Sequence, residues 1–309
     1  MEKTVLKNTP VFIVGMPRSG TTLLSNLINA SKQIYIPEET HYFIQKNNYL
    51  KLPNRKQKKQ SFNEFYLDQK NHYTKPLGLD LNEVEQLKRT DDTNFFQKLI
   101  SFKLKNNSNI ERWGEKTPIH FTCTDDILTL YPNAKIIHII RDPRDVFNSM
   151  IKSNWHNVFP YNLRYEQYKK ATILFKKSSK SIINIKYEDL INDSNSSLKK
   201  IYSFCNLKYN DSILETFYQK ENVNFSIENE PWKANNLKAI DNSSIYKWKK
   251  NQDDAMIQFT GWYLRSEIES LNYPSSRSIN ILKIVGFYAK IKIISILKLI
   301  KQTYLNYIQ

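Results

Sequence analysis

Residues 11–22 read Val-Phe-Ile-Val-Gly-Met-Pro-Arg-Ser-Gly-Thr-Thr, and most of the fold assignment rests on this stretch. Gly15 and Gly20 keep the G-x-x-x-x-G spacing of a phosphate-binding loop, between an apolar β-branched run and a helical pattern. Backbone N–H groups of such a loop, and the helix N-terminus behind it, face an anion. An NTPase needs lysine directly after the second glycine, whereas this chain has Thr21 there and carries its cation at Arg18 inside the loop. The loop therefore predicts phosphate binding without transfer of a γ-phosphoryl group.

A second motif predicts a second phosphate site. The apolar run 135–140 is typical of a buried strand and ends in Arg141, where a Walker-B strand would end in an aspartate that holds Mg²⁺. Asp142 is a good N-cap and Pro143 a good first helical residue, so a helix is expected to begin here. Ser149 lies about two turns along that helix, on the side of its start. We expect Arg141 and Ser149 to bind a phosphate distant from the loop, as in a nucleotide with a 5′-phosphoryl group and a separate 3′-phosphate.

Five motifs occur in one order between residues 9 and 250 and together resemble a known family. They are Pro-Arg-Ser-Gly-Thr-Thr at 17–22, Gly-Glu-Lys-Thr-Pro at 114–118, Arg-Asp-Pro-Arg-Asp-Val at 141–146, Lys-Tyr-Glu-Asp-Leu at 186–190 and Tyr-Lys-Trp-Lys at 246–249. This set resembles the PAPS-dependent sulfotransferases (PAPS is 3′-phosphoadenosine 5′-phosphosulfate), in a bacterial form related to the tyrosylprotein sulfotransferases. The resemblance implies PAPS as the co-substrate and no metal.

The resemblance also implies which residues bind the nucleotide. The expected contacts to the 5′-phosphosulfate come from the loop residues Arg18, Ser19, Gly20, Thr21 and Thr22. The 3′-phosphate is assigned to Arg141 and Ser149, with Lys247 and Lys249 reaching it as well. Tyr187 and Trp248 match the adenine-side contacts of the family, although an aromatic residue at a strand end often belongs to the core.

Sulfuryl transfer needs a base for the acceptor and cations for the developing charge. Glu38 and Glu39 follow a short predicted strand at 34–36, and adjacent carboxylates tend to raise one of their two pKa values. From the residues alone, two interpretations have equal weight: one glutamate is a catalytic base, or both are first-turn acids that stabilise the N-terminus of the next helix. The segment resembles the Gly-Glu-Glu-Thr of tyrosylprotein sulfotransferases, which implies that Glu39 is the base and that Lys116 and Arg18 contact the sulfuryl group.

Two reserve bases and one unassigned role complete this assignment. His41 and His120 are reserve bases that are more typical of structural histidines. Residues 222–241 do not align with the family, and the residue that completes the sulfuryl site is expected there, with Ser226 and Lys233 as candidates.

Strands that alternate with helices predict an α/β fold, of the P-loop three-layer type, with a mainly parallel sheet flanked by helices. We expect helices over 21–31, 93–104, 121–131 and 163–180, and a last strand over 182–187. The predicted sulfotransferase domain is 1–275. Its polar segment 42–110 is interpreted as an acceptor-binding insertion, and 276–309 as a basic amphipathic C-terminal helix or tail.

Composition indicates the class of partner. Of 309 residues, 46 are Lys or Arg and 30 are Asp or Glu, which gives a formal net charge of +16. This charge favours a nucleotide, an acidic glycan or an anionic membrane face. The chain has no RNA-binding signature, so nucleic acid is not an expected partner.

Cys123 and Cys205 are far apart in the sequence, which is typical of core thiols in a protein of a reducing compartment. The first ten residues form too short and too polar a segment for a leader or anchor, which predicts a cytoplasmic enzyme. In one interpretation this enzyme is peripheral at the inner membrane face.

The tail contributes to that interpretation. Lys283, Lys290 and Lys301 fall on one helical face, and the tail has no uncharged apolar stretch near the ~20 residues that span a bilayer. One hypothesis is a helix that lies on anionic lipid. The other is a terminal helix packed on the domain or on a second subunit.

The predicted reaction is transfer of a sulfuryl group from PAPS to a hydroxyl group of a carbohydrate or glycolipid. Sulfation of protein tyrosine is the rival within this class. An ATP-dependent kinase is disfavoured by Thr21, by Arg141 and by the missing Walker-B acid. A PAP-binding module without turnover is disfavoured by the presence of Glu39 and Lys116.

Overall fold

A five-stranded sheet in the order β2-β3-β1-β4-β5 forms the centre of the protein, and every pairing between its strands is parallel. The strands are β1 (Val11–Gly15), β2 (Ile34–Tyr35), β3 (Arg112–Lys116), β4 (Lys135–Ile140) and β5 (Ile182–Lys186). This computed structural model describes residues 9–52, 61–68, 78–104, 110, 112–152, 161–177, 179–218, 242–276 and 280–293. Four of the five strands were predicted, to within one residue.

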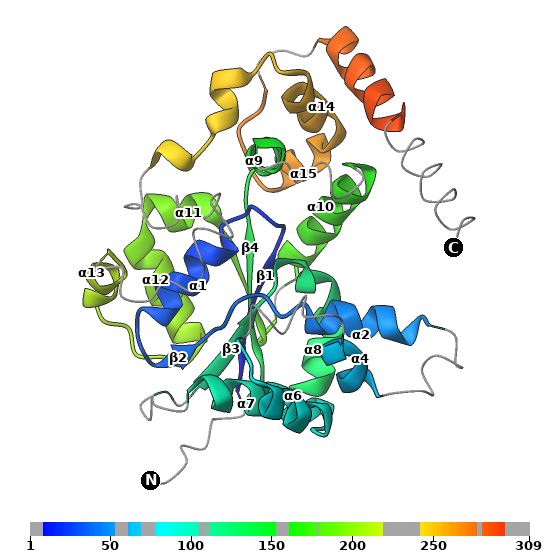
Figure 1. Ribbon diagram of the computed structural model, residues 1–309. Helices are drawn as coiled ribbons and strands as arrows, with labels where there is room; N and C mark the ends of the chain where they lie inside the picture. The colour runs from blue at the N-terminus through cyan, green and yellow to red at the C-terminus, as the bar shows by residue number, and fades with distance from the viewer. Residues whose placement is uncertain are drawn as a thin grey trace.

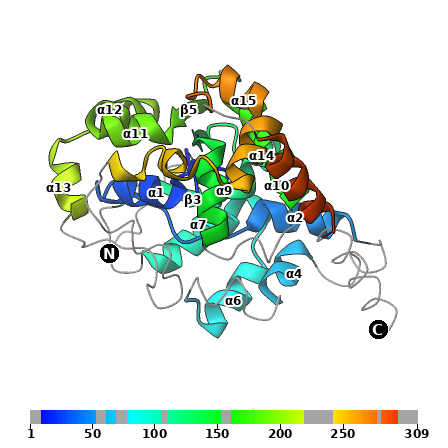
Figure 2. The same ribbon diagram turned by 90° about the horizontal axis from the view of Figure 1, so that it is seen from above.

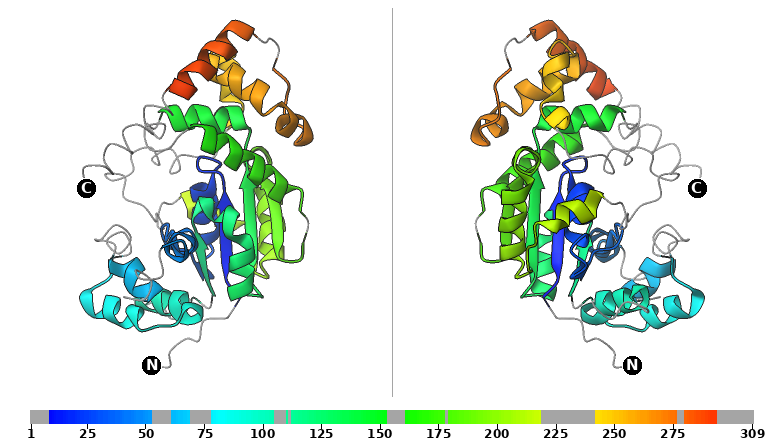
Figure 3. Two further views of the ribbon diagram at one scale, coloured as in Figure 1. Left: turned by 90° about the vertical axis from the view of Figure 1, so that its right-hand side faces the viewer. Right: turned by 90° about the vertical axis from the view of Figure 1, so that its left-hand side faces the viewer.

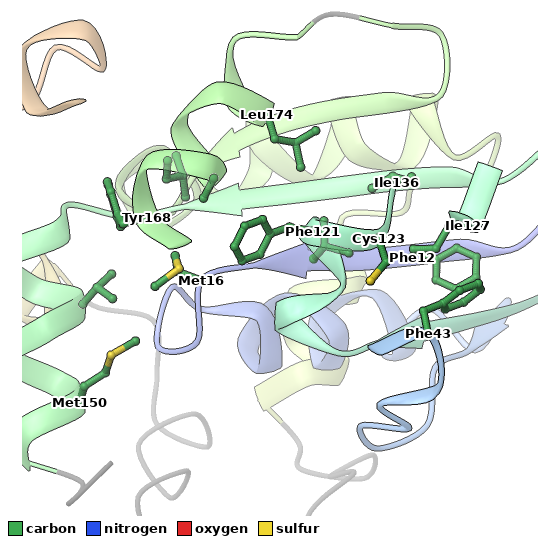
Figure 4. Close-up of a cluster of buried hydrophobic side chains, with 14 of the residues drawn as sticks. Phe12, Met16, Phe43, Phe121, Cys123, Ile127, Ile136, Met150, Tyr168 and Leu174 are labelled. Atoms are coloured by element: carbon green, nitrogen blue, oxygen red, sulfur yellow. The ribbon is translucent and has the colours of Figure 1, made fainter. Parts of the chain in front are cut away.

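The central strands are apolar without alternation because helices cover both faces of the sheet. All residues of β1 are buried, and so are all of β4 after Lys135. Phe12 and Ile136 point into one hydrophobic cluster while Ile13 and Ile137 point into another. Figure 4 shows part of the first cluster, where Phe12 of β1 lies near Phe43. The predicted three-layer α/β fold is confirmed.

The face of the sheet that carries Ile13 and Ile137 is covered by one helix that precedes β5 in the sequence and three that follow it. These helices are α1 (Thr21–Asn29), α11 (Tyr187–Asn192), α12 (Ser194–Phe204) and α13 (Ser212–Tyr218). They lie together on one side of the strands in Figure 1. Helix α1 confirms the helix predicted directly behind the loop.

The other face is covered by the 3₁₀ turn η1 (Pro118–Cys123), α8 (Thr124–Leu130) and α10 (Tyr161–Phe175). The expected helix over 121–131 therefore begins as a 3₁₀ turn. The helix expected over 163–180 ends earlier, at Phe175.

Strand β3 was not predicted. Its sequence, Arg-Trp-Gly-Glu-Lys, has three charges and a glycine, yet all five residues are buried between β2 and β1. Arg112 is satisfied by the backbone carbonyls of Thr9 and Cys205, to which its guanidinium donates. A Cβ on Gly114 would lie 2.5 Å from the carbonyl oxygen of Val11, so the close approach to β1 requires glycine.

The segment 42–110 supplies four described helices at one end of the molecule (Figure 2). They are α2 (Tyr42–Leu50), α4 (Phe62–Asp68), α6 (Leu81–Lys88) and α7 (Asp92–Lys103). Their aromatic side chains pack together, with the rings of Tyr42 and Phe95 4.6 Å apart between centroids. Helix α7 agrees with the helix predicted over 93–104. The acceptor-binding role of this segment stays a prediction.

A further layer lies beyond the carboxyl ends of the strands. It contains α9 (Pro143–Lys152), the short turns η4 (Asn242–Ser244) and η5 (Lys247–Asn251), α14 (Ala255–Tyr263), α15 (Arg265–Ser270) and a helical segment at 281–293. Pro143 is the first residue of α9, as predicted. Figure 3 shows this layer at the end of the molecule opposite to α6 and α7.

Candidate active site

The predicted motifs meet at the carboxyl edge of the sheet because each follows a parallel strand. Arg18 lies in the loop after β1, Glu39 after β2, Lys116 at the end of β3, Arg141 after β4 and Tyr187 after β5. Ligands of parallel α/β sheets bind at this edge. The fold thus collects residues that are far apart in the sequence.

The loop between β1 and α1, where the sequence predicts an anion site, combines a left-handed glycine with buried hydroxyl groups. Gly20 adopts φ 97°, a left-handed conformation. It is the N-cap residue of α1, so the first turn of this helix has no side-chain cap. A Cβ on Gly20 would also collide with the ring of Tyr187. Ser19 is fully buried, and its hydroxyl oxygen has no hydrogen-bond partner within the described residues. Thr21 is buried and Thr22 is half-buried.

The two predicted phosphate motifs touch each other. The Nε of Arg18 donates to the Oγ of Ser149 at 3.0 Å, and the Nη1 of Arg141 donates to the carbonyl oxygen of Arg18 at 3.2 Å. Arg141 and Ser149 were expected to bind a phosphate distant from the loop. The protein groups of the two motifs adjoin, because β1 and β4 are neighbours and their carboxyl ends lie side by side, while the separation of the two phosphates stays a prediction. We refer to Arg18, Ser19, Arg141 and Ser149 as the phosphate edge.

Arg141 is held in place on several sides. Its guanidinium lies 4.4 Å from the ring centroid of Tyr187, and its Nη2 donates to the carbonyl oxygen of Ser244 at 2.7 Å. The hydroxyl of Tyr187 donates to the Oγ of the same serine at 2.9 Å. The Nε of Arg141 is buried and has no hydrogen-bond partner among the described residues. Its donor is therefore available to an anion.

The segment 246–249 is attached to α9. The carboxylate of Asp145 accepts hydrogen bonds from the backbone N–H groups of Lys247 and Trp248, at 3.2 and 2.8 Å. The side chains of Lys247 and Lys249 are exposed, and their contact with a phosphate stays a prediction.

Trp248 lies in the core, with 1% of its surface exposed. Its Nε1 donates to Asp142 at 3.0 Å, and the guanidinium of Arg144 lies 3.5 Å from its ring centroid. These contacts describe a structural role in attaching η5 to α9. The adenine contact of Trp248 stays a prediction, and this burial argues against it.

The predicted base and the predicted transfer cation are in direct contact. The Nζ of Lys116 donates to the Oε1 of Glu39 at 2.7 Å, and the side chains are 4% and 21% exposed, respectively. The Nε2 of His41 lies 3.5 Å from the other oxygen of Glu39, and burial lowers the pKa of His41. A hydroxyl group that approaches Glu39 would lie beside Lys116. We refer to Glu39 and Lys116 as the transfer pair.

Glu115 supports the transfer pair through hydrogen bonds to Thr40 and Thr117, a role that was not predicted from the sequence. Its fully buried carboxylate accepts hydrogen bonds from Thr40 N (3.3 Å), Thr40 Oγ1 (2.8 Å), Thr117 Oγ1 (2.5 Å) and His120 Nδ1 (3.0 Å). Burial by itself raises the pKa of Glu115, but the charge of His120 and these hydrogen bonds outweigh it and lower the pKa to about 2. Glu115 therefore joins the segment of Glu39 to the strand end of Lys116.

His120, a reserve base in the sequence analysis, is fully buried on Glu115 and has a structural position. Alternation along a strand could have indicated the inward position of Glu115, since Lys116 faces the site. That signal was unusable because β3 was not recognised as a strand.

Glu188 has the corresponding position behind the phosphate edge. Its Oε1 accepts from the backbone N–H of Asp142 at 2.9 Å and its Oε2 from the hydroxyl of Tyr273 at 3.0 Å. Burial raises the pKa of Glu188 to about 7. The carboxyl group holds the start of α9 directly after Arg141. It too was not identified from the sequence.

Ser226 and Lys233 lie outside the described residues. Within the described ranges, no three His, Cys, Asp or Glu side chains come together as metal ligands would. Cys123 and Cys205 are both buried and unpaired.

Comparisons with known proteins identify the family of the chain. A family model described as the sulfotransferase family matches residues 10–211. A protein-tyrosine sulfotransferase of Drosophila melanogaster is 23% identical over 225 residues, which are 69% of this chain and 41% of that protein. An uncharacterised protein of Aquifex aeolicus is 24% identical over 256 residues, 78% of this chain and 30% of its own length. The chain thus spans less than half of either relative.

A solved structure has the same fold. The sulfotransferase domain of the Synechococcus PCC 7002 olefin synthase superposes with a TM-score of 0.60 at 19% identity, over 88% of this chain and 98% of that domain.

Proposed function

The chain belongs to the sulfotransferase family, and from that membership we propose that it transfers the sulfuryl group of PAPS to a hydroxyl group of a carbohydrate or glycolipid. The observation that carries the choice of donor is the phosphate edge. It joins the loop of β1 to the motif of β4 through Arg18, and a donor that bears a 5′-phosphosulfate and a 3′-phosphate has groups for both motifs.

The residues present fit such a donor. The buried hydroxyl of Ser19 and the buried Nε of Arg141 have no hydrogen-bond partner within the described part of the chain, and buried polar groups are rarely left so. An anion that accepts from both would satisfy them. The exposed Lys247 and Lys249 add positive charge on the side of Arg141.

The transfer pair supplies the chemistry in this proposal. The acceptor oxygen forms a bond to sulfur while the bond from sulfur to the 5′-phosphate oxygen breaks, which yields a sulfate ester and PAP. Glu39 takes the proton of the acceptor hydroxyl. Lys116 and Arg18 stabilise the negative charge that develops on the leaving and sulfuryl oxygens. Glu115 is a positioning residue, which keeps the two members of the pair 2.7 Å apart through Thr40 and Thr117.

The glycan acceptor is supported by the net charge of +16, which favours acidic saccharides. Peptide tyrosine is a second candidate. It is favoured by the segment Glu38-Glu39-Thr40 and by the name of the Drosophila relative. Release of PAP from PAPS, measured with saccharide acceptors and with acidic tyrosine peptides at equal concentration, distinguishes the two. Turnover with the peptides but not with the saccharides would show that the acceptor is tyrosine and would overturn the carbohydrate proposal.

Nucleotide selectivity tests the donor. We expect calorimetric titration to give metal-independent binding of PAP that is tighter than binding of ADP or of ATP with Mg²⁺. The reason is that only PAP brings a 3′-phosphate to the side of Arg141 and Ser149. Preference for ATP with Mg²⁺ would overturn the proposal and make a kinase the working hypothesis.

We also propose that the reaction takes place in the cytoplasm. The support is the pair of buried thiols, Cys123 and Cys205, which remain unpaired. Fractionation of cells that produce the chain, with thiol alkylation of the unfolded protein, would test this location.

A further inference from the structure

The helical segment 281–293 has two apolar faces, and only one of them packs on the protein. Ile284 and Ile291 are buried, and the ring of Phe287 lies 5.4 Å from that of Phe259 in α14. Lys283 donates to the carbonyl oxygen of Asp253 at 2.7 Å. These contacts fix the rotation of the helix about its own axis.

The opposite face is apolar and exposed. Leu282 is 83% exposed and Ile281 is 71% exposed, while Val285 and Ile293 are each 57% exposed. Leu282, Val285, Ala289 and Ile293 follow one another at intervals of three and four residues, so they form one stripe along the helix. We refer to Ile281 and these four residues as the outer stripe. Single exposed apolar residues need no explanation, but a contiguous stripe of this kind marks an interaction surface.

Positive charge flanks the outer stripe on both sides. At ~100° per residue, Lys290 falls near one edge with Lys283, and Lys292 falls near the other edge beside Tyr288. The Nζ of Lys292 lies 5.4 Å from the ring centroid of Tyr288. Residues 270–309 contain six Lys or Arg residues and no Asp or Glu. The nearest acid with a contact to the helix is Asp253, which already pairs with Lys283.

We propose that the outer stripe docks on the surface of an anionic phospholipid bilayer, with the helix parallel to the membrane plane. Apolar side chains that point outward, with lysines along both edges, match an acyl boundary below a layer of phosphate headgroups. A second copy of the chain is the less favoured occupant, because two such helices would bring their lysines together without any acid between them.

In this proposal the helix lies parallel to the membrane plane. Among the residues that the structure describes, no helix has both the length and the apolar character required to span a bilayer. Trp262 of α14, which is 49% exposed, and Tyr288 both contact Phe259, at 5.9 and 6.0 Å between ring centroids. Aromatic residues of this kind favour the headgroup region.

Sedimentation with vesicles tests the proposal in the full chain. We expect binding to phosphatidylcholine vesicles that contain phosphatidylglycerol, little binding to pure phosphatidylcholine, and weaker binding as salt is raised. The double variant Leu282→Asn/Ile293→Asn and the double variant Lys290→Glu/Lys292→Glu should each lower the partition coefficient by about tenfold or more. All four side chains are exposed, so these variants should keep their affinity for PAP.

Matched controls make the test specific. Leu81→Asn removes an equally exposed leucine (84% exposed) from α6, and Lys200→Glu reverses an exposed lysine of α12. Both controls should bind vesicles as the wild type does. The proposal is overturned by absence of binding to anionic vesicles, or by controls that lose as much binding as the stripe variants. It is also overturned if stripe variants change a dimer to a monomer without any effect of lipid, since a second copy would then cover the stripe.

Discussion

The phosphate edge and the transfer pair lie at the same edge of one sheet, but their polar groups are satisfied in different ways. At the phosphate edge, the buried Ser19 hydroxyl and the Arg141 Nε have no hydrogen-bond partner within the described residues. At the transfer pair, Glu39 and Lys116 neutralise each other at 2.7 Å, above a carboxylate of Glu115 that accepts four hydrogen bonds. In our proposal an anion completes the first region, whereas the side chains of the second already bind each other.

A buried glutamic acid lies behind each region, Glu188 at the phosphate edge and Glu115 at the transfer pair, and the pKa values of the two are shifted in opposite directions. The pKa of Glu188 is about 7 and the pKa of Glu115 is about 2. Burial dominates at Glu188, while the hydrogen bonds and the charge of His120 dominate at Glu115. The substitutions below separate the two regions, from the largest expected effect to the smallest.

Removal of the base should affect turnover and spare donor binding. Glu39→Gln is expected to lower the rate of sulfuryl transfer by about 10²- to 10⁴-fold, because the acceptor proton loses its base. The Kd for PAP, measured by calorimetry, should change by less than about threefold. Glu38→Gln is the matched control and should keep most of the rate. An unchanged rate in Glu39→Gln would show that the base is another residue.

Removal of the Arg141 guanidinium should instead weaken donor binding. Arg141→Ala is expected to raise the Kd for PAP about 100-fold, because charge-assisted hydrogen bonds to a phosphate are lost. The exposed Arg89, directly after α6, gives the control, and Arg89→Ala should bind PAP normally. Equal affinities of Arg141→Ala and the wild type for PAP would separate Arg141 from the nucleotide.

The pH dependence of stability should report Glu188. Its pKa is about 7 in the folded chain, against an ordinary value of 4.5, so the folded state binds this proton more tightly than the unfolded state. The contribution of this group is therefore fully present below about pH 4.5 and is lost as pH rises through 7, by up to about 3 kcal/mol.

Glu188→Gln should remove that component, so that the free energy of unfolding changes less between pH 5 and pH 8 than in the wild type. Urea denaturation at a series of pH values measures it, with the exposed Glu85→Gln as control. An identical pH profile in Glu188→Gln and wild type would contradict the assignment. Glu115 has the opposite sign, since its contribution is present above about pH 4.5 and is lost as pH falls toward 2.

The positioning role of Glu115 predicts a selective loss of rate. Glu115→Gln is expected to lower kcat about tenfold with little change in the Kd for PAP, since only the alignment of Glu39 with Lys116 is disturbed. Because the variant also loses stability, Ile127→Val in the buried part of α8 serves as a destabilised control that keeps its kcat. Proportional losses of kcat and stability in both variants would reduce Glu115 to a structural residue.

The smallest effect is expected at Ser19, with opposite outcomes for stability and binding. Ser19→Ala removes a buried hydroxyl without a protein partner, so the free energy of unfolding should stay equal or rise slightly. The Kd for PAP should rise about fivefold, because one hydrogen bond to the nucleotide is lost. A fall in stability without any change in PAP binding would show that the hydroxyl serves the fold alone.

Much of this architecture follows from short-range patterns. The strand–loop–helix at 11–29, the strand at 135–140 and the start of α9 at Pro143 were all predicted, because glycine spacing, apolar runs and helix caps act within a few residues. The order of motifs was enough to assign the family. The outer stripe is different, because the sequence left open whether this helix packs on the domain, and the structure has it do so by one face only.

Other features depend on which strands become neighbours. Local propensity did not reveal β3, whose charges are tolerated only because Arg112, Glu115 and Lys116 each find a partner on another segment. The contact of Ser149 with Arg18 requires β4 beside β1, and the contact of Glu39 with Lys116 requires β2 beside β3. Residue types and their spacing thus indicate the chemistry, because both are properties of the sequence itself. Distances between segments, and the pKa values of Glu115 and Glu188, arise only when the sheet is assembled, because pairing and burial are properties of the folded chain.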